Sequence, residues 1–300
     1  VCACACVCVC VCRYRALVVL VGSEWARPSE DSRLALIRTT LRHFGAHVVI
    51  LPSDSFNTAA VAQVSRLYAS LAGGVGDEDW LLTSDADLIP LTGEYFTSAR
   101  DWSKDIHMYN SFCCNPLKLP DDGLESIRGK DWNVRDVELG AEDFEDTIDY
   151  SSDLRLLHQP VSFVGARASV WRELMGVERV TTGLLPDGGV PLEMQRIVEG
   201  VLVRELGEDK ATLELGHSRM HDDMKMWHLD QRMLSARAAA SRFFPAGVEM
   251  IPRNAHADRL DRMRWRIPRT LEGLVDAHMP QPGFTEQHWP SVRKLVRMLL

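Results

Sequence analysis

Three short apolar runs in the first third of the chain most constrain its fold, because amphipathic segments of helical periodicity separate them. The runs are Ala16–Val21, His47–Leu51 and Trp80–Thr83. Strand, helix and strand in alternation, with short connections, predict a parallel sheet with right-handed crossovers. We therefore expect an α/β fold with a mostly parallel central sheet and flanking helices. The apolar residues at helical spacing are Leu34, Ile37, Leu41 and Phe44, then Val61, Val64, Tyr68 and Leu71.

The first predicted helix has clear start and stop signals. Ser29 or Ser32 can cap its first turn, and Gly45 can end it. Pro52 stops the strand that follows, and Gly73-Gly74 ends the second helix. These signals support the order β-α-β-α-β.

Asp85 and Asp87 come directly after the third apolar run, and Pro90 should soon halt the extended backbone. In an open α/β sheet, ligands bind beyond the carboxyl ends of the strands. Two carboxylates separated by one residue can coordinate a hard divalent cation, which in turn can hold a diphosphate. The alternative is that both carboxylates merely cap a turn. A second such pair, Asp77 and Asp79, lies in a Gly-rich turn before the strand, where a solvated loop is expected.

The rest of the chain predicts further strands and helices around a charged excursion. We expect strands at Ile106–Asn110 and Gln159–Gly165, and a solvated acidic segment at 121–153. Helices are expected around Val170, Trp171 and Leu174, around Met194, Ile197, Val198, Val201 and Leu202, from Asp230 through Arg242, and around Val292, Leu295, Val296 and Leu299.

Two later residues carry possible chemistry. Asp230 stands where a helix begins, and its carboxylate is equally suited to a general base or to a helix N-terminal charge. His278 lies near Pro280, so a loop position is expected, where a lone His is usually structural or exposed. A zinc hydrolase is disfavoured, because His217 and His221 lack the Glu that follows the first His of a metalloprotease helix.

Composition excludes several classes of function. The net charge of −8, without a basic stripe interleaved with aromatic residues, argues against a nucleic-acid partner. Gly22-Ser23-Glu24-Trp25 follows the first strand where a dinucleotide-binding or P-loop enzyme has a Gly-rich phosphate loop. No run approaches the roughly 20 apolar residues that span a bilayer, so membrane association is not visible and no location is predicted.

Six of the eight Cys fall in residues 1–12, where they alternate with Val or Ala. A disulfide framework spreads its Cys through the fold, so we interpret this tract as a translated simple repeat or a fragment start outside the fold. We expect one domain over residues 13–300, with one half at 13–110 and another at 155–300.

The order of these features resembles the metal-dependent nucleotide-sugar glycosyltransferases of the GT-A fold, as a divergent branch. The specific parts are Asp85-Ala86-Asp87 after a strand and Trp227-His228-Leu229-Asp230-Gln231. The resemblance implies transfer of a sugar from a nucleotide diphosphate sugar to a carbohydrate or other hydroxylated acceptor, with Mn²⁺, or Mg²⁺, at the diphosphate.

The resemblance would make residues 13–110 the nucleotide-sugar-binding half and residues 155–300 the acceptor and metal-completing half. It also implies roles for individual residues. Asp85, Asp87 and His278 would hold the metal, and Asp230 would be the catalytic base facing the acceptor. The donor and acceptor contacts would come from Ser84, Ala86, Asn110, Gly165, Trp227 and Gln231. Two other classes stay open: a non-catalytic nucleotide or sugar binder with this fold, and a metal-dependent nucleotidyltransferase or phosphohydrolase.

Overall fold

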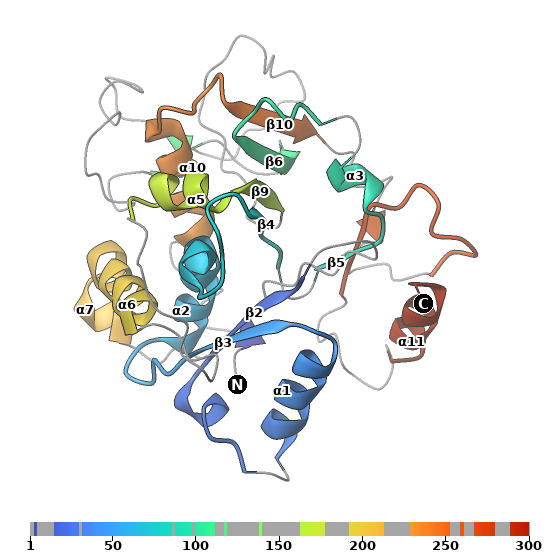
Figure 1. Ribbon diagram of the computed structural model, residues 1–300, viewed down its shortest axis with the longest axis horizontal. Helices are drawn as coiled ribbons and strands as arrows, with labels where there is room; N and C mark the ends of the chain where they lie inside the picture. Colours follow the sequence, from blue (N-terminus) through green and yellow to red (C-terminus); the bar gives the residue numbers. More distant parts are fainter. Residues whose placement is uncertain are drawn as a thin grey trace.

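The computed structural model describes residues 3–4, 15–29, 32–85, 88–97, 100–111, 117–118, 138–139, 163–177, 192–212, 229–252, 259–260, 267–279 and 289–299. They form a mixed α/β structure with helices around short sheets, several of whose strands run parallel (Figure 1). The predicted α/β class is confirmed at this level.

The first sheet contains the first two predicted strands. β2 (Leu17–Val21) and β3 (His47–Leu51) pair in parallel over their full length, as expected. The other edge of β2 pairs antiparallel with β1 (Ala3–Cys4). These two residues of the Cys tract therefore extend a sheet, where we expected the whole tract to lie outside the fold.

The third predicted strand belongs to a different sheet, which corrects the expected run of three parallel strands. β4 (Trp80–Leu82) is at the edge of a sheet in the order β10-β6-β9-β4. Its neighbour β9 (Val164–Arg167) is antiparallel to both β4 and β6 (Ile106–Ser111), whereas β10 (Val248–Pro252) is parallel to β6.

Contacts across β4 and β9 explain this choice of partner. The Thr83 amide donates to the Val164 carbonyl at 2.9 Å, and the Val164 amide donates to Thr83 Oγ1 at 3.0 Å. Gly165 lets the Trp80 ring lie against β9, because a Cβ at Gly165 would be only 2.9 Å from that ring. A bulkier residue at 165 would push β4 away.

A small third sheet joins distant parts of the chain in the order β11-β12-β5. β5 (Leu88–Pro90) pairs antiparallel with β12 (Asp276–His278), and β12 is parallel to β11 (Arg259–Leu260). His278 is therefore in a strand, which corrects its expected place in an irregular loop. The strand forms because β5 offers it a ladder of backbone hydrogen bonds.

The helices largely follow the sequence patterns. Ser32 Oγ accepts from the Ala35 amide at 3.1 Å and caps α1 (Arg33–His43), and Gly45 follows it at φ +77°. The second predicted helix is α2 (Thr58–Ser65), continued as the 3₁₀ helix η2 (Arg66–Leu71). The remaining described elements are η1 (Ser23–Trp25), α3 (Glu94–Thr97), β7 (Leu117–Lys118), β8 (Glu138–Leu139), α5 (Ala168–Leu174), α6 (Leu192–Leu206), α7 (Glu208–Thr212), α10 (Leu229–Ala240) and α11 (Trp289–Leu299).

One apolar core holds both larger sheets together. Val49 of β3, Ile106 of β6 and Val164 of β9 belong to the same buried cluster as residues of α2, α5, α6 and α10. Each such aliphatic side chain contributes about 1.5–3 kcal/mol through burial. α11 packs instead on the small third sheet, where Leu295 contacts Leu260 and Ala277.

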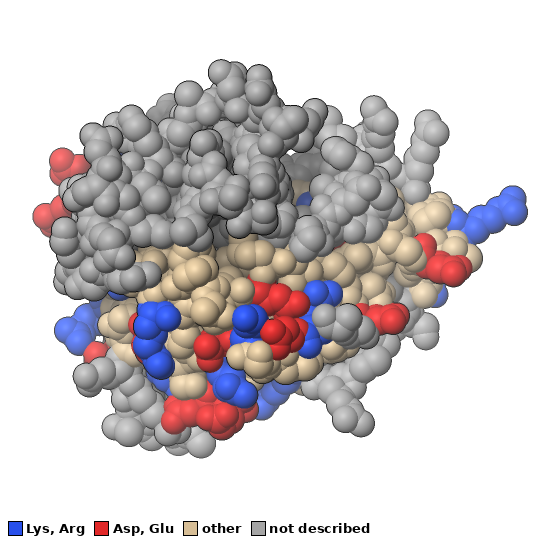
Figure 2. Space-filling view, turned by 90° about the horizontal axis from the view of Figure 1, so that it is seen from above, with Lys and Arg blue, Asp and Glu red and all other residues tan. Residues whose placement is uncertain are grey.

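The described surface carries both signs of charge. On the face in Figure 2, acidic and basic side chains are interspersed, without a broad basic area on the described part of this face. Within the described residues, no helix is long and apolar enough to cross a membrane.

Candidate functional site

The guanidinium of Arg66 joins two of the predicted site residues. Arg66 is the first residue of η2 and is 6% exposed. Its Nη1 contacts Asp85 Oδ1, and its Nη2 and Nε contact Asp230 Oδ2, the Nε contact at 2.7 Å. The fold therefore places two carboxylates that are far apart in sequence around a single guanidinium.

Asp85 presents one carboxylate oxygen beyond this ion pair. Its side chain is 30% exposed at the carboxyl end of β4. Oδ2 takes part in no hydrogen bond or ion pair among the described residues. The backbone turns here, because the Leu88 amide donates to the Asp85 carbonyl at 3.2 Å, and Ser84 Oγ donates to the same carbonyl at 3.1 Å. Ser84 thus supports the turn, while Ala86 and Asp87 lie outside the described residues.

The register of β12 against β5 brings the predicted histidine to the same turn. His278 pairs with Leu88, the residue that follows Asp87. β12 is held firmly, because Arg259 donates to both oxygens of the buried Asp276, at 2.6 and 2.9 Å. A segment near the end of the chain therefore lies directly beside the Asp-x-Asp turn.

Asp230 is fully buried at the start of α10. Its Oδ1 accepts from the Gln231 amide at 2.8 Å, while Oδ2 accepts from Arg66. Burial raises the pKa of Asp230, and the Arg66 guanidinium opposes that shift. In this conformation both oxygens are engaged inside the protein, so the role of Asp230 as a base facing an acceptor stays a prediction.

The other predicted contact residues have different surroundings. Gln231 Oε1 is buried and has no hydrogen-bond partner among the described residues. Gly165 lies in β9 between Leu82 of β4 and His107 of β6, where the Trp80 ring fills the space beside it, so its observed role is in packing. Asn110 is in β6. Its side chain and the whole of Trp227 are outside the described residues.

A cavity of about 500 Å³ extends along β4 from the Asp79 end to Arg66. Residues of both larger sheets line it, including Leu17, His47 and Trp80. Ser70 Oγ, on its wall, is buried without a hydrogen-bond partner among the described residues. This cavity lies at the amino ends of β2 and β3, and it also reaches Leu82 and Thr83 at the carboxyl end of β4, the strand end where a ligand was expected. Arg66 lines the cavity and also contacts Asp85 and Asp230.

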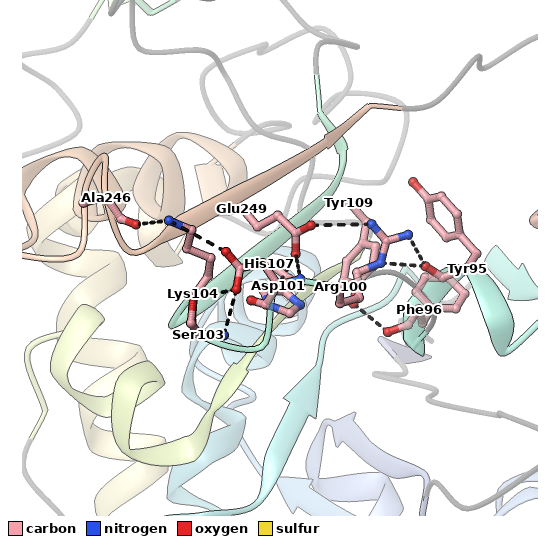
Figure 3. A network of polar contacts seen from close by, with 10 residues as sticks. All are labelled: Tyr95, Phe96, Arg100, Asp101, Ser103, Lys104, His107, Tyr109, Ala246 and Glu249. Atoms are coloured by element: carbon pink, nitrogen blue, oxygen red, sulfur yellow. Dashed lines mark hydrogen bonds and ion pairs between the residues drawn. The ribbon is translucent and has the colours of Figure 1, made fainter.

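A second polar cluster lies around the buried His107 (Figure 3). His107 Nε2 is 3.5 Å from Glu249 Oε2, and Arg100 donates to the Tyr95 carbonyl while it lies over the Tyr95 and Tyr109 rings. Burial lowers the pKa of His107, and Glu249 opposes the shift. The contacts tie β6 to β10 and to the segment after α3, which is a structural arrangement.

Arg66 is the site residue that the sequence analysis missed. It follows the apolar face of α2 and directly precedes the buried Leu67 and Tyr68. A charged residue inside such an apolar stretch is the one signal that could have identified it, since buried charges require partners. Its partners are distant in sequence, so only the fold reveals them.

A complete metal centre is not contained in the described residues: no three His, Cys, Asp or Glu side chains among them form a group that could hold a metal ion. Of the predicted ligands, Asp87 is outside the described residues. Comparisons with protein-family models, with curated proteins and with solved structures gave no match.

Proposed function

We propose that this chain is a glycosyltransferase that moves a sugar from a nucleotide diphosphate sugar to a hydroxylated acceptor, with a divalent cation at the diphosphate. The observation that carries the proposal is that Arg66 joins Asp85 to Asp230, while the strand of His278 pairs with the strand that follows the Asp85 turn. These residues come from three separate parts of the chain, and packing alone does not require acidic residues to gather there.

The side chains that the proposal assigns to this turn are of the types that bind a hard divalent cation. Asp85 Oδ2 is a carboxylate oxygen without a described partner, on a side chain that is 30% exposed. Asp87 would add a second carboxylate and His278 an imidazole, a mixed set that suits Mn²⁺ better than Mg²⁺. When bound there, the cation would stabilise the negative charge that grows on the leaving diphosphate.

The protein's own residues would organise the rest of the reaction. Asp85 and Asp87 would orient the diphosphate, while Asp230 would take the acceptor proton as the new glycosidic bond forms. Because Asp230 is buried against Arg66, this base role requires Asp230 to become accessible in the complex with substrates. A direct displacement of this kind inverts configuration at the anomeric carbon.

The test is thermal unfolding with a panel of nucleotide diphosphates and nucleotide sugars, each with and without Mn²⁺. A ligand that binds only the native state raises the melting temperature, so we expect one nucleotide series to stabilise the protein, and only with metal. Release of nucleoside diphosphate from the stabilising nucleotide sugar then measures the bond cleavage itself.

Asp87→Asn should abolish both the metal-dependent stabilisation and the release. The matched control is Asp79→Asn, in the other Asp-x-Asp pair at the opposite end of β4, where Asn can still accept from the Gly76 amide. Equal loss in both variants, or no stabilisation of the unmodified protein by any nucleotide, would contradict the proposal.

A further inference from the structure

The cavity along β4 is not used by the proposed sugar transfer. Its volume of about 500 Å³ is within the range of small-molecule sites, roughly 300–1,000 Å³. Its lining comes from the amino ends of β2 and β3, from η2, from β4 and the residues just before it, and from α5. The space therefore lies between the two larger sheets, where a small molecule can be removed from water.

Most of the inner wall of this cavity is apolar. Trp171 is 1% exposed, and Ala69 and Leu82 are each 7% exposed, so these side chains are shielded from bulk water. Leu17 and Val75 extend the same surface. Such a wall favours the apolar body of a ligand, by about 25 cal/mol for each Å² of apolar surface that leaves water.

The rim of the cavity carries two neighbouring basic side chains. Arg15 is exposed and precedes β2, and His47 is the partly buried first residue of β3. The two segments meet there, because the His47 amide donates to the Ala16 carbonyl at 2.7 Å. Burial and then the nearby Arg15 charge lower the pKa of His47, so the two side chains are within electrostatic reach of each other.

Neither basic side chain has an acidic partner within the described part of the chain. There, the one side-chain hydrogen bond of Arg15 runs from Nε to the Gly45 carbonyl at 3.3 Å, so its terminal Nη groups are available. Asp79 is the acidic residue of the lining. Its Oδ2 accepts from the Gly76 amide at 2.7 Å, and it forms no ion pair with Arg15. The rim is therefore suited to a negatively charged group.

We infer that this cavity binds a small apolar carboxylate, with the hydrocarbon body along β4 and the carboxylate held at the rim by Arg15 and His47. A planar guanidinium matches a carboxylate with two parallel hydrogen bonds. Arg66, the other arginine of the lining, already contacts Asp85 and Asp230, which leaves Arg15 as the anion partner. The site needs neither a metal nor a nucleotide, so it is independent of the proposed function.

Isothermal titration of the full chain with octanoate and with 1-octanol tests the two parts of the site separately. The two ligands share a hydrocarbon chain and differ in charge, so we expect octanoate to bind about tenfold more tightly than octanol. In Arg15→Met, octanoate should lose this advantage, whereas the affinity for octanol should stay the same. Arg15→Lys keeps the positive charge and should keep most of the advantage.

Arg42→Met is the matched control. Arg42 is an exposed arginine in the last turn of α1, three residues before Gly45, and it is not part of the lining. Its substitution should leave both affinities unchanged. His47→Gln removes the second basic group of the rim and should weaken octanoate binding by a smaller factor than Arg15→Met, again without an effect on octanol.

Three results would overturn the assignment of this site: no binding of octanoate, equal binding of octanoate and octanol, or an unchanged difference between them in Arg15→Met. Competition with nucleoside diphosphates, with and without Mn²⁺, separates this site from the proposed function. Displacement of octanoate would mean that the cavity belongs to the nucleotide site, which would overturn the carboxylate site and support the function. Binding of octanoate without binding of any nucleotide would support the carboxylate site and overturn the function.

Discussion

Two buried arginines hold opposite ends of the same strand, yet their charge environments differ. Arg172 contacts Asp77 before β4 and donates to the Ser70 carbonyl at 2.8 Å, so one cation meets one carboxylate that is 42% exposed. Arg66 contacts Asp85 after β4 and also the fully buried Asp230. The carboxylate of the first pair is partly solvated. The second arginine also binds a fully buried carboxylate, which water cannot solvate if the arginine is removed.

The largest effect should follow Arg66→Met alone. This substitution leaves the Asp230 carboxylate buried without its cation, and breaking a buried ion pair in this way costs about 3–5 kcal/mol. Urea unfolding at neutral pH would measure the loss. A loss of less than about 1 kcal/mol, which is the net contribution of a typical hydrogen bond, would show that Asp230 is not held as an ion.

Arg172→Met should cost less, about 2 kcal/mol, since water can solvate the exposed Asp77 carboxylate once the arginine is gone. The same urea experiment provides the comparison. If Arg172→Met destabilised the protein as much as Arg66→Met, the contrast between a partly solvated and a fully buried carboxylate would not hold.

A third buried basic side chain near β4, His107, allows a test by pH. Burial lowers its pKa below the usual 6.5, so the folded protein binds this proton less readily than the unfolded chain does. The stability that depends on neutral His107 is present above pH 6.5 and is lost as the pH falls through the lowered pKa. His107→Gln should weaken the dependence of the unfolding free energy on pH. This slope is measured between about pH 8 and pH 5, a range that includes the usual histidine pKa of about 6.5. An identical slope in the variant would rule out His107 as its source.

The smallest effect should come from Ser70→Ala. The Ser70 hydroxyl is buried at the cavity wall without a hydrogen-bond partner among the described residues. The backbone carbonyl of Ser70, by contrast, accepts a hydrogen bond from Arg172. Removing the hydroxyl should therefore change stability by no more than about 0.5 kcal/mol. A loss comparable to that of Arg172→Met would show that the hydroxyl has a partner that stabilises the fold.

Local patterns predicted most of the described elements because their causes are local. The apolar run at 17–21, the cap at Ser32 and the glycine at 45 each act within a few residues, and β2, α1 and the start of β3 follow them closely. The strand of His278 could not be predicted in this way. Three residues near a proline carry too little local signal, and β12 exists only because β5 pairs with it.

The same distinction between local patterns and contacts of distant residues applies to the candidate site. The sequence by itself determined that carboxylates follow β4 and begin α10, because strand ends and helix starts are local features. It also determined the α/β class through the period of its apolar residues. Only the tertiary structure decided that β4 pairs with β9, that Arg66 links Asp85 to Asp230, and that His278 lies opposite Leu88. Those contacts join residues far apart in the chain. Their energies depend on how deeply each group is buried and on which charges lie nearby, and the fold as a whole determines both.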